Sequence, residues 1–142
     1  QPDDGFEERT IMRITENASE PTKLLLERKL TNPAFDIDVR AYWLRRFVIT
    51  LRDNASMLAA CQRMLGGTIE EVLRSRIIEI LFEYQPKAWY RPHSVPKIPD
   101  RNMMTEEAKR LLLEIGRNAI GQIKLEPSLE EKVEAEVKSL EQ

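Results

Sequence analysis

The sequence has little of the chemistry on which most active sites and metal centres depend. It contains one cysteine, Cys61, and one histidine, His93, in 142 residues. A metal site or a nucleophile with its base needs several such groups in one place. Phosphate-binding glycine loops, HExxH and CxxC pairs and GxSxG elbows are also missing. We therefore expect no metal, no cofactor and no enzyme activity, although catalytic residues that converge only in three dimensions stay open as an alternative.

The scarcity of cysteine and of long apolar runs bears on the compartment. A single thiol excludes an intrachain disulfide, so we expect a soluble intracellular protein in a reducing compartment, either the cytosol or the interior of an organelle. No run approaches the ~20 apolar residues that cross a bilayer, and no signal peptide is recognisable. Because the sequence begins at Gln1 rather than Met, we expect that an upstream segment was removed, and a targeting segment could have been part of it.

Glycine is also scarce, and positive charge is not in excess. The chain has 5 glycines, 42% hydrophobic and 32% charged residues, which is typical of a helical globular protein. Its net charge of −2 creates no global positive field that would attract nucleic acid. The length fits one core, so we expect a single helical domain over residues 1–142.

The longest amphipathic segment covers about residues 38–65. Leucines recur in it every seven residues and form a continuous apolar stripe, at positions Leu44, Leu51, Leu58 and Leu65. The spacing predicts one long central helix, with Asp36 or Asp38 as its N-cap. The polar residues 53–56 favour turns, so a break there is the alternative. The leucine spacing keeps its phase across them and favours one helix.

The next segment, about residues 68–84, predicts a helix that packs antiparallel to the first. Gly66 and Gly67 are suited to end the central helix. Thr68 follows as an N-cap, and Glu71 stands three residues later, as in a capping box. The apolar face of this helix includes Val72. A short link between two amphipathic helices predicts an αα-hairpin.

The remaining segments complete an all-α bundle of five to six helices. A proline in the first turn, Pro21, favours a helix that runs to about Leu30. Thr105 is suited to cap a helix in which Gly116 and Gly121 indicate the close approach of another backbone or a kink. Ser128 and Glu131, three residues apart, predict a second capping box. Segments 1–18 and 127–142 are expected to be peripheral helices.

Four prolines interrupt the helical pattern between residues 85 and 104. They predict a long extended loop, because proline cannot continue a helix: Pro86, Pro92, Pro96 and Pro99. Long irregular connections in compact domains are commonly functional. This loop carries residue types that are enriched at binding hot spots. Within segment 85–100 we predict that a protein partner is contacted by Trp89, Tyr90, Arg91 and His93.

The leading functional hypothesis is therefore a non-catalytic protein–protein interaction or assembly module, either an adaptor or a subunit of a larger complex. The competing interpretation places the proline-rich loop over its own bundle, with Trp89 and Tyr90 in the core. A long loop is either packed by its own side chains or functional, so both interpretations stay open. The partner's identity and the oligomeric state do not follow from the sequence.

The alternative function is that of an RNA-binding accessory protein. Basic residues along segment 38–65 are interleaved with the aromatic residues Tyr42 and Trp43, and such a face could contact phosphates and stack on bases. A solvated helix face with Trp43 packed in the core is the competing interpretation. The candidate RNA-binding residues are Arg40, Arg45, Arg46 and Arg52.

Cys61 lies on the apolar stripe of the 38–65 segment, beside Leu58 and Leu65. Apolar neighbours raise the pKa of a thiol and make it a poor nucleophile. We therefore expect Cys61 to pack in the core rather than to react.

Overall fold

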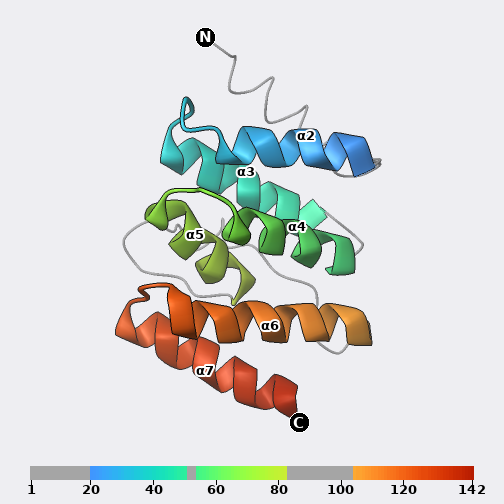
Figure 1. Ribbon diagram of the computed structural model, residues 1–142, viewed down its shortest axis with the longest axis vertical. Coiled ribbons are helices and arrows are strands. Elements are labelled where there is room, and N and C mark those ends of the chain that lie inside the picture. The colour runs from blue at the N-terminus through green and yellow to red at the C-terminus, as the bar shows by residue number, and fades with distance from the viewer. Residues whose placement is uncertain (1–19, 51–53, 83–103) are drawn as a thin grey trace.

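The computed structural model describes residues 20–50, 54–82 and 104–142 (Figure 1). It describes side chains over these ranges except at positions 20–23, 25–26, 45–50 and 54. The described residues form helices and no strands, which confirms the all-α fold class. The helices are α2 (Glu20–Thr31), α3 (Ile37–Thr50), α4 (Asn54–Gly66), α5 (Glu71–Leu81), α6 (Glu106–Gln122) and α7 (Pro127–Glu141). The helix expected in 1–18 and most of the proline-rich loop lie outside the described residues.

The helices stack along the long axis of the molecule, from α2 at one end to α7 at the other (Figure 1). The α2 helix packs on α3 and α4, and α5 packs more extensively on α3 than on α4. The α6 helix contacts α4 on one side and α7 on the other. The α6 and α7 helices run antiparallel (Figure 1). Consequently α4 lies between α2 and α6, and it borders both of the surface depressions described below.

The central helix differs from the expectation, because segment 38–65 is not one continuous helix. A straight helix would separate Arg40 from Gly66 by about 39 Å, whereas the four residues from Gly66 to Glu70 span at most ~14 Å. Arg40 Nη1 nevertheless lies 3.0 Å from Glu70 Oε1. The α3 helix ends at Thr50, α4 begins at Asn54, and the two run in opposite directions (Figure 1).

The heptad spacing was misleading because both helices face the same core. Leu44 on α3 and Leu58 on α4 are buried to the same degree. Two helices that fold back on each other can therefore keep the leucine phase that one helix would show. The polar residues around the break are the ones that favoured the alternative interpretation.

The core is continuous from α2 to α7 and is mainly aliphatic. Trp43 is 1% exposed and meets Phe35 edge-on, with ring centroids 5.1 Å apart. Trp43 is therefore a core residue rather than a surface aromatic. Val72, which was expected on the inner face of its helix, is 51% exposed.

Two of the expected helix caps are confirmed. Asp36 Oδ2 accepts a hydrogen bond from the backbone N–H of Asp38 at 3.0 Å, at the start of α3. Thr105 Oγ1 accepts one from the N–H of Ala108 at 3.1 Å, at the start of α6. Each side chain satisfies one of the N–H groups that the first helical turn leaves without a partner.

The two predicted capping boxes are wrong. The α5 helix starts at Glu71 with Glu70 as N-cap, so Thr68 lies outside it. The α7 helix starts at Pro127 with Glu126 as N-cap, which places Ser128 inside the first turn. Proline at the first helical position is a stronger start signal than the Ser–Glu spacing, because its φ is already helical and its missing N–H costs nothing there.

Gly116 marks a close approach, but of neighbouring side chains rather than of the backbone that was expected. A Cβ at this position would lie 2.7 Å from Val137 Cγ2 on α7 and 3.1 Å from Phe82 Cζ at the end of α5. At Gly121, near the end of α6, an added Cβ would have no such neighbouring atom within 4 Å. Gly116 therefore permits α6 to pack tightly against both neighbours.

Candidate functional site

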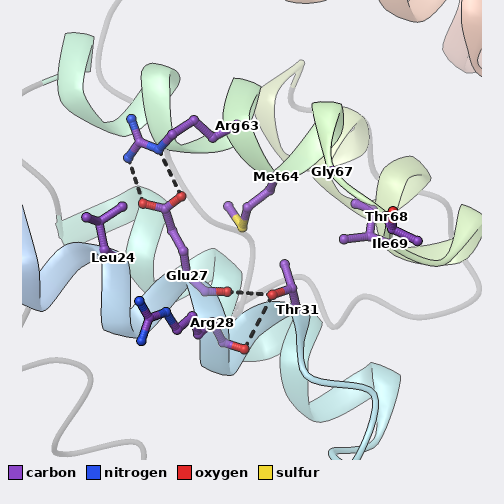
Figure 2. A pocket seen from close by; sticks show the side chains of 9 residues that line it. All are labelled: Leu24, Glu27, Arg28, Thr31, Arg63, Met64, Gly67, Thr68 and Ile69. Atoms are coloured by element: carbon purple, nitrogen blue, oxygen red, sulfur yellow. Dashed lines mark hydrogen bonds and ion pairs between the residues drawn. The ribbon is translucent and has the colours of Figure 1, made fainter.

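Two of the surface depressions that the described residues form beside α4 are considered as candidate sites. The first, here called the α2–α4 groove, has a volume of about 300 Å³ and is lined by Leu24, Glu27, Arg28, Thr31, Arg63, Met64, Gly67, Thr68 and Ile69 (Figure 2). The second, here called the α4–α6 cleft, has a volume of about 500 Å³ and is lined by Gln62, Leu65, Gly66, Glu71, Arg74, Ile115, Asn118, Ala119, Gln122 and Ile123.

Two charged side chains that lie across the α2–α4 groove, Arg63 and Glu27, are paired with each other. Arg63 donates to Glu27 through Nε at 3.1 Å and through Nη2 at 2.6 Å (Figure 2). The Thr31 hydroxyl lies 2.9 Å from the backbone carbonyl oxygen of Glu27 and donates to it. Glu27 is only 8% exposed, so its carboxylate needs this bidentate partner. The groove therefore contains a structural tie between α2 and α4.

The α4–α6 cleft is built differently, with an apolar floor between polar walls. Ile115 and Ala119 are buried, and Leu65 and Ile123 are half-buried. The α6 contribution follows helical periodicity, because positions 115, 118, 119 and 122 share one face of a helix. This face is apolar toward α4 and polar toward solvent.

Three carboxamide side chains line the walls of this cleft. Gln62 comes from α4, whereas Asn118 and Gln122 come from α6. Within the part of the chain that the structure describes, these three side chains make no hydrogen bond. Each carboxamide carries an acceptor oxygen and two N–H donors. The cleft therefore presents unused donors and acceptors above an apolar floor.

The two charged residues of the cleft differ in what they contact. Arg74 donates through Nη2 to the carbonyl oxygen of Gly67 at 2.7 Å and through Nη1 to that of Leu65. Its positive charge thus covers the carboxyl end of α4. Glu71 Oε1 lies 3.6 Å from Arg74 Nε, and the Glu71 side chain is 76% exposed. The Glu71 carboxylate therefore stays accessible at the rim.

Arg40, one of the predicted RNA-contacting residues, is buried. It is 2% exposed and donates through Nε to the carbonyl oxygen of Phe35 at 2.9 Å, in addition to its contact with Glu70. The hydrogen bonds from this guanidinium are the main cause that lowers the pKa of Glu70 to about 2. Arg40 thus joins α3 to the start of α5 and offers no exposed surface to a phosphate.

The other predicted site residues are not brought together by the described structure. Arg45 and Arg46 lie on α3, but their side chains are outside the described residues, as is Arg52 altogether. The predicted partner-binding residues also lie outside them: Trp89, Tyr90, Arg91 and His93. Their role stays a prediction from the sequence.

Cys61 is fully buried on α4, as expected. Burial is the largest cause that raises the pKa of its thiol to about 12, followed by the nearby Glu27 carboxylate. A thiol with such a pKa is almost entirely protonated near neutral pH and is a poor nucleophile.

Residues 20–50, 54–82 and 104–142 contain no group of three or more His, Cys, Asp or Glu side chains that could hold a metal ion. No helix in these ranges has both the length and the apolarity needed to cross a membrane.

Comparison with known proteins identifies no relative. No protein-family model matches the chain, and neither a curated protein nor a solved structure shows significant similarity to it.

The carboxamides of the α4–α6 cleft were missed by sequence reasoning. Their signal is weak, because Asn118 and Gln122 are ordinary exposed residues of an amphipathic helix. They gain significance only when α4 places Gln62 on the facing wall, and that juxtaposition depends on tertiary packing.

Proposed function

We propose that the protein is a non-catalytic protein–protein interaction module, acting as an adaptor or as a subunit of a larger complex. The observation that carries this proposal is the α4–α6 cleft, in which carboxamides that have no partner among the described residues stand above an apolar floor. An apolar centre with a polar rim is the usual composition of a protein-binding surface. The hydrogen-bonding groups at the rim are in place before a partner arrives.

The shape of the cleft favours a macromolecular partner over a small molecule. Pockets for small ligands bury most of the ligand surface. The α4–α6 cleft opens on the surface between α4 and α6. Besides Glu71 and Arg74, it contains three uncharged amides spread over both walls. Such groups match the amides of a polypeptide rather than a single charged substituent.

The proline-rich segment 85–100 is the second contact element in this proposal. Its support comes from the sequence, because Trp, Tyr and Arg are enriched at hot spots and prolines reduce the ordering cost of an extended segment. If Trp89 and Tyr90 contact a partner, Trp89→Ala and Tyr90→Ala weaken partner capture and leave thermal stability nearly unchanged. A large loss of stability would instead place these rings in the core.

The described helices add no support for RNA binding as a second function. Among the described residues, the predicted RNA contact Arg40 is enclosed and paired with Glu70. No observation on the exposed surface of the described helices favours phosphate recognition.

Site-specific photocrosslinking tests the proposed function. A benzophenone crosslinker is introduced at the position of Asn118 in the cleft and, as a control, at that of Glu134, an exposed position on α7. Both proteins are incubated with extract of the native source, irradiated and analysed by mass spectrometry. The proposal predicts a discrete crosslinked protein from position 118 that is absent from position 134. Equal background labelling at both positions, with no specific partner at any salt concentration, would contradict it.

A further inference from the structure

We propose that the α4–α6 cleft binds an extended, basic peptide segment of the partner. This inference rests on the proposed function and adds the chemistry of the bound segment. It follows from three properties of the cleft, namely the spacing of its carboxamides, the apolar floor between them and the exposed carboxylate at its rim.

The spacing of the carboxamides on α6 fits an extended backbone. Asn118 and Gln122 are four residues apart on a helix, so their Cβ atoms are separated by about 6 Å. An extended chain turns its N–H and C=O groups to the same side every second residue, which is about 6.6 Å. The two carboxamides can therefore pair with successive groups along one edge of a peptide, and Gln62 faces the other edge from α4.

A helical partner would not use these groups. The backbone N–H and C=O groups inside a helix are already paired with each other. A helix in the cleft would leave the carboxamides without backbone partners, whereas an extended segment has unpaired groups on both edges. The cleft is thus suited to a strand-like segment.

The floor and the rim set the side chains of the peptide. In an extended segment alternate side chains point to opposite faces, so every second one would meet the floor formed by Leu65, Ile115 and Ile123. These positions favour aliphatic residues. The side chains between them point to solvent and are not specified by the floor.

Charge complementarity favours a basic residue at the rim. Glu71 is 76% exposed and forms a 3.6 Å ion pair with Nε of Arg74, whose Nη2 is bound to the carbonyl oxygen of Gly67, so the outer side of the carboxylate stays open to a second cation. The last turn of α6, which also borders the cleft, has no basic residue to offset the partial negative charge of its carboxyl end. Residues 104–142 carry 6 basic and 9 acidic side chains, a difference of −3. A lysine or arginine of the peptide would pair with Glu71.

Peptide selection followed by affinity measurement tests this inference. A displayed library of random peptides is selected on the immobilised full chain, and the enriched peptide is synthesised with a fluorophore for anisotropy titration. We expect sequences that alternate aliphatic residues with others and contain lysine or arginine. Asn118→Ala and Gln122→Ala should each weaken binding about threefold to tenfold, the value of a net hydrogen bond. Glu71→Gln should weaken it and reduce its salt dependence.

The controls separate loss of contact from loss of folding. Alanine has a higher helix propensity than asparagine or glutamine, so the α6 variants should stay folded. Arg28→Ala, in the α2–α4 groove, should bind the peptide with unchanged affinity. The inference would be overturned if the selection enriched acidic peptides or no peptides at all. It would also be overturned if the bound peptide became helical, or if all cleft variants bound it with the same affinity. A different outcome is that crosslinking at position 118 identifies a partner that binds all the cleft variants as tightly as the wild type. That result would leave the proposed function standing and would remove only the extended-peptide binding mode.

Discussion

The α2–α4 groove and the α4–α6 cleft lie on two sides of one helix and differ in how the side chains that face each other across them are paired. In the groove, Glu27 and Arg63 satisfy each other, and the Thr31 hydroxyl bonds to backbone. In the cleft, the side chains of Gln62, Asn118 and Gln122 have no partner among the described residues. A polar pair of the first kind stabilises the fold, whereas groups of the second kind are available to another molecule.

This difference explains why volume or charge alone does not identify the candidate site. Both depressions contain formal charges, so charge alone does not separate the groove from the cleft. Buried polar groups are nearly always satisfied, and Glu27 follows this rule. Polar groups without a partner among the described residues are therefore better candidates for binding another molecule than groups that are already paired.

The largest expected effect concerns the inner face of α4, which both depressions share. With a pKa of about 12, the Cys61 thiol should react with a thiol reagent at pH 8 about a thousandfold more slowly than in the unfolded chain. The measurement compares the rate of modification in buffer with that in denaturant. If Cys61 were modified almost as fast in the native protein as in the unfolded chain, its thiol would not be buried by the packing of α4.

Removing the partner of Arg40 should cost the most stability. Glu70→Gln leaves a buried guanidinium without its counterion, and we expect a loss of about 2 to 3 kcal/mol in the free energy of unfolding, less than for a fully buried pair because Glu70 is partly exposed. Urea denaturation measures it. Glu71→Gln, the same substitution one residue along, is the control and should change stability by less than about 0.5 kcal/mol.

The same ion pair should make stability depend on pH in acid. Because the pKa of Glu70 is lowered from 4.5 to about 2, the folded state holds this carboxyl deprotonated where the unfolded state binds a proton. The stabilisation is complete above the unfolded pKa and is lost as pH falls from 4.5 toward 2. Denaturation at a series of pH values should show a shallower acid loss for Glu70→Gln than for the wild type. Parallel curves would exclude Glu70 as a source of acid sensitivity.

A smaller effect is expected for the pair in the α2–α4 groove. Arg63→Met leaves the nearly buried Glu27 carboxylate without its bidentate partner, which should cost about 1 to 2 kcal/mol. Arg28→Met makes the same change at an exposed arginine of the same groove and should cost less than about 0.5 kcal/mol. Equal losses for the two variants would show that the Glu27–Arg63 pair is not a structural tie.

The smallest effect on stability is expected in the α4–α6 cleft. The double variant Asn118→Ala, Gln122→Ala should keep its free energy of unfolding or gain a few tenths of a kcal/mol. Alanine favours the helix, and neither side chain is hydrogen-bonded to a described residue. A thermal or urea unfolding curve decides this. A loss above about 1 kcal/mol would indicate that the carboxamides support the fold, as the groove residues do.

Local signals in the sequence predicted much of the fold. Asp36 and Thr105 are caps because each is a short polar residue immediately before a helix. Gly116 was expected to mark a close approach, and Val137 and Phe82 meet it. The all-α class followed from helical periodicity and few glycines. These features depend on neighbours within a few residues or on one helix face.

The features that could not be predicted depend on how helices meet. The spacing of Leu44 and Leu58 is compatible with one helix or with two that face a common core, so α3 and α4 were predicted as one. Arg40 was expected on an outer face, but the fold brings Glu70 against it from thirty residues away. The α4–α6 cleft arises only when α6 packs beside α4, and no local pattern in either segment specifies that pairing.

The most direct test of the cleft as a partner-binding site is the NMR spectrum of its side-chain amides. The isotope-labelled chain is titrated with the selected peptide or with the partner protein that crosslinking identifies. The side-chain NH₂ resonances of Gln62, Asn118 and Gln122 are followed during the titration. Asn32 serves as the internal reference, because its Oδ1 already accepts a hydrogen bond from the N–H of Ala34 at 3.0 Å. We predict that the three cleft resonances shift and that the Asn32 resonance does not. Shifts that spare the cleft and fall on another surface would contradict the assignment.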